Sequence, residues 1–180
     1  PSVTLRSATP LAVHGSILKA QDILETASRG GVLTIRMVYG QAGPSVTPEE
    51  DWIGDAALAG DGALLTAGFP LIDLVQQLAG DIVEAYGIAS QRLGPPGGMD
   101  DNAFALVRCA GGVVAQIHAS RTQWRNTFRM EIGLERGYLW LEGLASEDGA
   151  YAPEMLISAR VKTDEFDHAL ANPPEEVRSF

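Results

Sequence analysis

Hydrophobic and polar positions change their spacing along the chain, and each change marks a predicted element. Over residues 13–27, apolar residues recur at steps of three and four, which is typical of one face of a helix. Gly30 and Gly31 then supply a helix stop, and residues 33–39 take up the period of two that a strand has. The chain therefore opens with a helix, a turn and a strand.

A second helix is predicted over residues 70–79, because Pro70 suits a first helical turn and Gly80 ends the apolar run. Short strands follow, and Gly112 and Gly137 allow the positive φ that tight hairpins need. Strands joined by tight turns pair antiparallel. The predicted strands after this helix cover residues 82–90, 103–109, 113–120, 127–133, 138–142 and 154–161.

The predicted fold class is α+β, a two-layer domain in which a mainly antiparallel sheet of about six strands carries helices on one face. Residues 1–161 are expected to form this domain. Residues 41–61 are expected to be a long surface excursion with Trp52 as its large aromatic residue. Residues 162–180 are expected to be an acidic, solvated tail whose aromatic docking points are Phe166 and Phe180.

The outer face of the predicted sheet has a mixed composition. Gln116 and His118 alternate with apolar residues in one strand, and Tyr138 and Trp140 do so in another. Aromatic rings among polar groups suit a surface that is buried against another protein, so we expect a self-associating sheet. The alternatives are an exposed face that carries a tryptophan, and a catalytic role for His118.

Composition narrows the possible functions. The 13 basic and 23 acidic residues give a formal net charge of −10, which disfavours nucleic acid as a partner. Cys109 is the only cysteine, so it is expected to be a small buried strand residue rather than part of a disulfide. No apolar run reaches the roughly 18 residues that span a bilayer. We expect a soluble, cytoplasmic protein that does not bind a membrane.

Polar residues at strand ends supply the candidate chemistry. Trp124, Arg125 and Asn126 form a connection between two strands and combine an aromatic face, a guanidinium fork and an amide, groups that hold a sugar or a phosphate. The alternative is a loop tryptophan that covers the sheet edge. Asp100 and Asp101 could bind a metal, although such residues more often end loops and begin elements.

The remaining polar motifs do not predict a cofactor or metal site. Gly60, Asp61 and Gly62 lack the third glycine of a dinucleotide loop, so their glycines are expected to permit a turn or a close backbone approach. No two histidines have the spacing of a helical metal site, and His14 and His168 are expected at the surface.

Several ordered segments carry a family resemblance. They read GGVLTIRMVYG at 30–40, GDGALLTAGFPLIDLVQQLAG at 60–80, DDNAFALVRCAGGVVAQIHAS at 100–120 and TQWRNTFRMEIGLERGYLWLEGL at 122–144. In this order they resemble the C-terminal domain of the Gfo/Idh/MocA oxidoreductases, the glucose-fructose oxidoreductase and inositol dehydrogenase-like family. The segments around Trp124 and Gly143 are most similar to members that act on sugars or nucleotide sugars.

The resemblance implies a C-terminal domain like that of dihydrodipicolinate and glyceraldehyde-3-phosphate dehydrogenases. In the family, this domain shapes the sugar pocket and forms a homo-oligomer through its open sheet. NAD or NADP is bound mainly by an N-terminal Rossmann domain, which has no counterpart in this sequence. The isolated chain is therefore not expected to be an active enzyme.

One helix departs from the family pattern. Members commonly carry an aspartate, then a histidine four residues later and a further aspartate three residues after that, where this chain has Thr66, Pro70 and Asp73. Thr66 is the catalytic candidate at these positions, but a hydroxyl is not a general acid or base near neutral pH. Asp73 is the candidate substrate ligand, or a first-turn carboxylate that answers the helix dipole.

Two functions are compatible with these residues. The first is the substrate-binding and oligomerisation domain of an NAD(P)-dependent oxidoreductase acting on a sugar or nucleotide sugar. The second is a sugar-binding or assembly module that derives from the same family and has lost catalysis.

Overall fold

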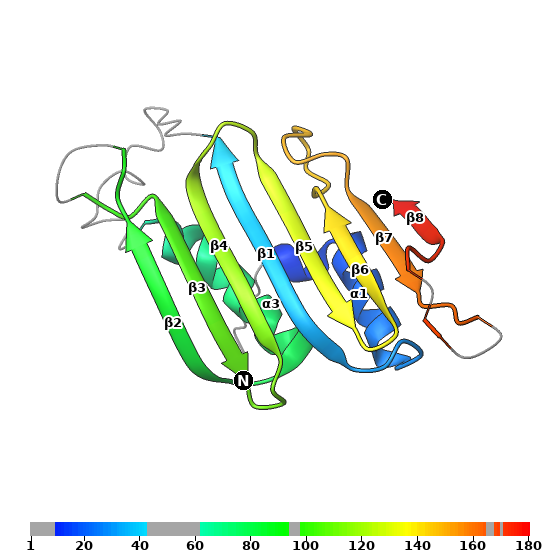
Figure 1. The fold of residues 1–180 in the computed structure, drawn as a ribbon. Helices are drawn as coiled ribbons and strands as arrows, with labels where there is room; N and C mark the ends of the chain where they lie inside the picture. Colours follow the sequence, from blue (N-terminus) through cyan, green and yellow to red (C-terminus); the bar gives the residue numbers. More distant parts are fainter. Residues whose placement is uncertain (1–9, 43–61, 94–97, 165–167, 170) are drawn as a thin grey trace, which may run out of the picture.

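The computed structural model describes residues 10–42, 62–93, 98–164, 168–169 and 171–180. Two layers form the fold, a single twisted sheet and a layer of helices that covers one face of it (Figure 1). Trp52, Gly60, Asp61, Phe166 and nearly all of the predicted 41–61 excursion lie outside the described residues.

The sheet has eight strands rather than the six or so expected from the sequence, in the order β2-β3-β4-β1-β5-β6-β7-β8. All neighbouring pairs are antiparallel except β1 and β4, so the mainly antiparallel prediction is confirmed. The strands are β1 (Val32–Ala42), β2 (Ile82–Ser90), β3 (Asn102–Cys109), β4 (Val114–Gln123), β5 (Thr127–Leu134), β6 (Gly137–Glu142), β7 (Met155–Arg160) and β8 (Glu175–Ser179).

Strand β1 lies between β4 and β5 and pairs with both. Thr34 to Gly40 run parallel to Val114 to Ser120, and the same residues run antiparallel to β5. Consecutive strands β4 and β5 therefore do not pair with each other. Sequence periodicity predicts the strands but gives no sign of this insertion, because the partners are far apart along the chain.

Helices occupy one face, as predicted. A short 3-10 turn, η1 (Pro10–Val13), leads into α1 (Gly15–Glu25), and a π-helical turn, η3 (Leu64–Gly68), leads into α3 (Phe69–Ala79). α1 is shorter than the predicted 13–27, whereas α3 agrees with its prediction to within one residue. Gly80, at φ 83°, ends α3 in a conformation that glycine adopts readily.

The core lies between the sheet and the helices. Leu71 and Leu74 of α3 are fully buried, and each such side chain stabilises the fold by about 1.5–3 kcal/mol. The inward positions of β4 and β6 are apolar as the alternation predicts, and Cys109 is buried in β3 as expected. Inward strand residues of this core include Ile35, Met37, Ala115, Ile117, Phe128, Met130, Ile132, Leu139, Leu141 and Leu156. No helix among the described segments has the length and apolar character needed to cross a membrane.

Part of the segment that is predicted to be a solvated tail forms an edge strand. β8 pairs antiparallel with β7, and the amide of Phe180 donates to the carbonyl of Glu154 over 3.1 Å. All five side chains of β8 are exposed, so backbone hydrogen bonds hold this edge strand. A strand with no buried face has no apolar alternation, and the sequence pattern therefore missed it.

A buried carboxylate fixes the start of α1. Glu154, 2% exposed, accepts hydrogen bonds from the amides of Ser16 (2.6 Å) and Ala145 (2.7 Å). His14 Nδ1 lies 3.3 Å from the same carboxylate, so the expectation that His14 is a surface residue is wrong. The first turn of α1 contains no acidic residue, and Glu154 supplies that charge from a distant loop.

Replacing Glu154 by glutamine should lower the free energy of unfolding by about 1–3 kcal/mol, because the new NH2 group cannot accept from two converging amides. Denaturant unfolding at neutral pH measures this. Glu147→Gln, an exposed change in the same loop, is the matched control and should leave the unfolding midpoint unchanged.

The stabilisation should also depend on pH. Burial alone would raise the pKa of Glu154, but hydrogen bonds from Ser16, Ala145 and His14 outweigh it and hold this pKa below its ordinary value of 4.5. A carboxylate with a lowered folded pKa contributes fully above its unfolded pKa and loses that contribution as the pH falls through the folded value. The difference between the native protein and Glu154→Gln should therefore be constant above pH 4.5 and shrink below it. A difference unchanged down to about pH 3 would contradict this account.

Candidate functional site

The predicted ligand loop crosses one end of the sheet. Because β1 lies between β4 and β5, the connection at 124–126 passes over the carboxyl end of β1. The Trp124 side chain is 92% exposed, so it does not cover the sheet edge. Arg125 is exposed and forms no ion pair with any described residue, and its carbonyl accepts from Thr127 Oγ1 over 2.9 Å.

Arg125 and Asn126 border a small cavity of about 150 Å³ at this end of the sheet. Its far wall is the loop that joins β6 to β7, where Gly143 has a φ of 71° and its α-carbon lies too close to the carbonyl of Pro153 for any side chain. Arg129 and Glu142 also line it and are paired with each other at 2.6 Å. Ligand pockets usually measure about 300–1,000 Å³, so this cavity is smaller than a usual ligand pocket.

Two tyrosines that the sequence analysis did not select meet behind this loop. Tyr39, at the end of β1, lies 5.6 Å from Tyr151 and 6.1 Å from Phe128 between ring centroids. Burial raises the pKa of both tyrosine phenols, so both are neutral hydrogen-bonding groups across the physiological range. Tyr39 is the last inward position of its alternating strand, but no local pattern links it to Tyr151.

The π-helical turn η3 carries Thr66. Its hydroxyl donates to the carbonyl of Gly62 over 2.9 Å, within the turn itself. Such turns are rare and occur frequently at functional sites. A side chain at Gly62 would collide with the backbone of Asp100, which confirms the close approach predicted for this glycine. Pro70 lies in the first turn of α3, as expected.

Asp100 and Asp101 organise backbone rather than hold a metal. Asp100 accepts from the amide of Leu64 over 3.0 Å at the start of η3, and Asp101 accepts from the amides of Arg92 and Leu93 over 2.7 and 2.5 Å. Burial would raise the pKa of Asp101, but these amides lower it below its usual range. These hydrogen bonds agree with the interpretation that the pair ends a loop and begins elements. Among the described residues, no group of three or more histidine, cysteine, aspartate or glutamate side chains is placed to hold a metal ion.

The Asp73 side chain forms a hydrogen bond within the helical layer. Gln77 donates to its carboxylate over 2.8 Å, and Gln21 of α1 donates to Gln77 over 3.3 Å. The first turn of α3 contains no acidic residue, so the helix-dipole interpretation of Asp73 is wrong. Asp73 does not border the cavity lined by Arg125 and Asn126.

The four predicted interface residues all lie on the open face, opposite the helices. His118 stacks on Phe104 with centroids 4.1 Å apart, and its Nε2 lies 3.2 Å from Asn102 Oδ1. Partial burial lowers the pKa of His118. Gln116, Tyr138 and Trp140 line a shallow groove of about 400 Å³ over β1, β5 and β6.

The structure thus separates the predicted residues into three places. Trp124, Arg125 and Asn126 lie at the end of the sheet beside the two tyrosines. Thr66 and Asp73 lie on the helical segment, and Tyr39 packs against Ala67 of η3, which links the helical segment to the end of the sheet. The remaining four residues lie on the open face.

Comparison with known protein families now defines the class. Residues 17–140 match the model of the GFO/IDH/MocA C-terminal domain. This match covers more than half of the chain, so the chain belongs to that family. A search of curated protein sequences gives no match.

Solved structures with the same fold are dehydrogenases and related oxidoreductases. Levoglucosan dehydrogenase in complex with NADH and levoglucosan gives a TM-score of 0.71 at 20% identity, covering 92% of this chain and 44% of that one. UDP-N-acetylglucosamine 3-dehydrogenase from Acidithiobacillus ferrooxidans gives 0.63 at 16% identity, covering 94% and 45%. An oxidoreductase domain protein from Kribbella flavida gives 0.65 at 24% identity, covering 92% and 43%. The chain spans less than half the length of each of these structures.

The raised pKa values at the end of the sheet give a direct test of the geometry. In an alkaline titration followed by tyrosinate absorbance, Tyr39→Phe and Tyr151→Phe should each remove a phenol that ionises above the ordinary value of 10.0. A titration in which Tyr39→Phe removes an ordinary phenol would contradict the packing described here.

Proposed function

We propose that this chain is the substrate-binding and oligomerisation domain of an NAD(P)-dependent oxidoreductase acting on a sugar or nucleotide sugar. The observation that carries the proposal is the family match over residues 17–140. The levoglucosan dehydrogenase structure holds NADH and levoglucosan, and the Acidithiobacillus ferrooxidans protein is a nucleotide-sugar dehydrogenase.

The cavity beside the 124–126 loop supports a sugar site completed by a second surface. One wall offers the Arg125 guanidinium, which has no ion pair among the described residues, and the Asn126 amide, and the exposed indole of Trp124 precedes them in the chain. Tyr39 and Tyr151 add neutral phenols that can donate to sugar hydroxyls. The space is too small for a whole sugar pocket, so the other wall must come from outside the described residues.

Thr66 and Pro70 restrict what this domain does in the reaction. A nicotinamide cofactor accepts or supplies hydride, and a titratable side chain must move the hydroxyl proton. Neither Thr66 nor Pro70 can do this near neutral pH. In the proposal the proton-transfer group and most of the cofactor site belong to an N-terminal nucleotide-binding domain, while this domain orients the substrate.

The second candidate is a sugar-binding or assembly module without catalysis, which the same two residues favour. The two proposals differ in one measurement on the full-length protein that contains this chain. A sugar-dependent change in NAD(P)H absorbance supports the oxidoreductase. Sugar binding without any such change supports the module.

Arg125→Gln should raise the KM for the sugar by about tenfold or more, because a charged hydrogen-bond donor is lost from the substrate wall. The KM for the cofactor should stay the same, since the cofactor lies on another domain in this proposal. Arg160→Gln, an exposed change at the far end of β7, is the matched control. An unchanged sugar KM in Arg125→Gln would contradict the placement of the site.

The open sheet face supports the proposed homo-oligomer. Apolar side chains are exposed on two parts of it, Tyr86, Ile88, Phe104 and Leu106 on β2 and β3, and Trp140 on β6. The first four line a groove of about 460 Å³ with little polar surface around it. Contiguous exposed apolar surface of this kind marks protein interaction sites.

Trp140→Glu should lower the molar mass measured by light scattering, because a charge would be buried without a partner in the assembled sheet. Trp140 is 44% exposed in the single chain, so the change itself is tolerated by the fold. Leu18→Glu is the control, since Leu18 is 51% exposed on α1, on the helix side. A native protein that is already monomeric would overturn the proposal.

A further inference from the structure

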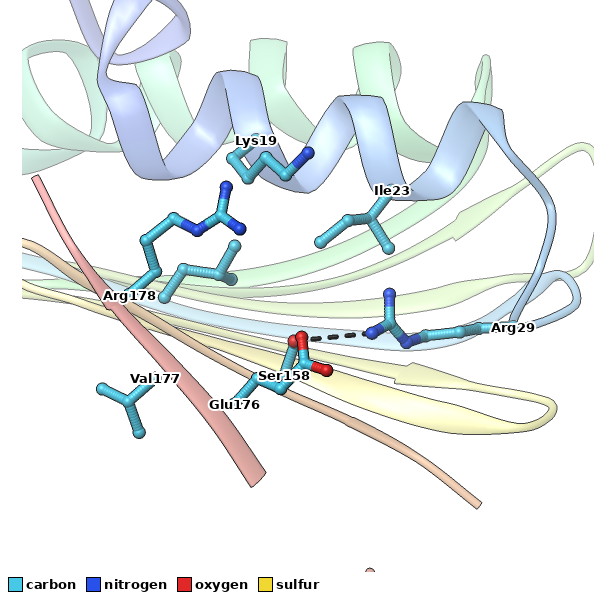
Figure 2. Close-up of a pocket in the computed structure, with 8 residues that line it drawn as sticks. Lys19, Ile23, Arg29, Ser158, Glu176, Val177 and Arg178 are labelled. Atoms are coloured by element: carbon cyan, nitrogen blue, oxygen red, sulfur yellow. Dashed lines mark hydrogen bonds between the residues drawn. The ribbon is translucent and has the colours of Figure 1, made fainter. Parts of the chain in front are cut away.

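A pocket of about 270 Å³ lies between α1 and the edge of the sheet formed by β7 and β8 (Figure 2). It opens on the helix side and shares no residue with the cavity at the 124–126 loop. The proposed oxidoreductase function gives it no role. Its lining residues are Lys19, Ile23, Arg29, Leu156, Ser158, Glu176, Val177 and Arg178.

Three basic side chains converge on this pocket from separate parts of the fold. Lys19 comes from α1, Arg29 from the turn before β1, and Arg178 from β8. Figure 2 shows Arg29 and Arg178 extending into the space between the helix and the strands, whereas Lys19 lies along α1 and Val177 points away. In a chain with a net charge of −10, such a cluster needs an explanation.

The two guanidinium groups have donors to spare. Arg29 Nε is buried and makes no hydrogen bond, and its Nη2 reaches Ser158 Oγ only at 3.4 Å (Figure 2). Arg178 forms no ion pair with any residue that the structure describes. A buried donor without a partner is unfavourable, so a ligand that accepts from Arg29 would bind more tightly for that reason.

The negative groups nearby leave room for an anion. Asp22 lies outside the pocket and is paired with Lys19. Glu176 is the only carboxylate among the lining residues, and its side chain is exposed. No ion pair joins Glu176 to either arginine among the described segments, so neither guanidinium is neutralised by direct contact.

We propose that this pocket binds the phosphate group of a small phosphorylated metabolite. Guanidinium forks match the geometry of phosphate oxygens, and the Ser158 hydroxyl and the Lys19 ammonium add a donor and a charge. Ile23 and Leu156 form an apolar wall against which a short carbon skeleton can pack. The volume suits a phosphate with a few carbon atoms and is small for a nucleotide.

Such a ligand would connect parts of the fold that few direct contacts join. Arg178 belongs to the edge strand β8, which has no buried side chain, and Arg29 and Lys19 belong to the helical layer and its following turn. A phosphate held by all three ties β8 to α1. Ligand binding would therefore slow amide hydrogen exchange in β8 more than in edge strand β2.

The test is calorimetric titration of the full-length protein with inorganic phosphate, at constant ionic strength kept with chloride. Arg29→Gln and Arg178→Gln should each weaken phosphate binding about tenfold or more. Glu176→Gln should strengthen it severalfold, because the nearest like charge is removed. Arg92→Gln, which removes an exposed arginine after strand β2 at the opposite edge, should leave it unchanged.

Circular dichroism before each titration establishes that the variants are folded. If an arginine variant unfolds, the predicted gain in phosphate affinity of Glu176→Gln still tests the proposal. Equal weakening in Arg29→Gln and Arg92→Gln would overturn the proposal, since it would indicate a general charge effect. No binding of phosphate by the native protein at millimolar concentration, or no gain in Glu176→Gln, would overturn it as well. If a phosphorylated triose slows amide hydrogen exchange in β8 more than phosphate alone does, the ligand is a metabolite. If both slow it equally, the ligand is the free ion, and the proposal of a metabolite is wrong.

Discussion

The pairing of β1 with both β4 and β5 is the constraint on which the rest of the structure depends. It produces the one parallel pair observed, and it prevents β4 and β5 from meeting in a hairpin. Their connection must therefore pass over the end of β1, where Arg125 and Asn126 line the same cavity as Tyr151. The candidate sugar site is a result of strand order, because this order brings the 124–126 loop to the loop between β6 and β7.

A second long-range contact sets the other wall of that site. The Glu154 carboxylate accepts a hydrogen bond from the amide of Ser16 at the start of α1 and another from the amide of Ala145. The two ends of the loop between β6 and β7 are thus joined to each other through Glu154, which also joins them to the start of α1. Tyr151 belongs to this loop, so the cap of a helix and the position of a phenol in the site depend on the same carboxylate.

Local patterns predicted those features that have a local cause. Alternation in 113–120 and 138–142 identified both faces of the sheet, since a period of two places every second side chain on the core side. β8 escaped detection because a strand exposed on both faces needs no apolar alternation. His14 and Tyr39 were misjudged or missed because their partners, Glu154 and Tyr151, lie more than a hundred residues away. The π-helical turn at Thr66 has no distinct signature in a hydrophobic pattern.

The insertion of β1 also has a consequence for the order in which the chain can fold. β1 ends at Ala42, yet neither of its neighbours begins before Val114. At about 5–20 residues per second, the ribosome needs several seconds to make the intervening chain. During that time β1 has two unpaired edges, while helices α1 and α3 are the elements available to cover its apolar side. Synthesis of this domain therefore includes a period in which its future central strand is open to chaperones and to other nascent chains.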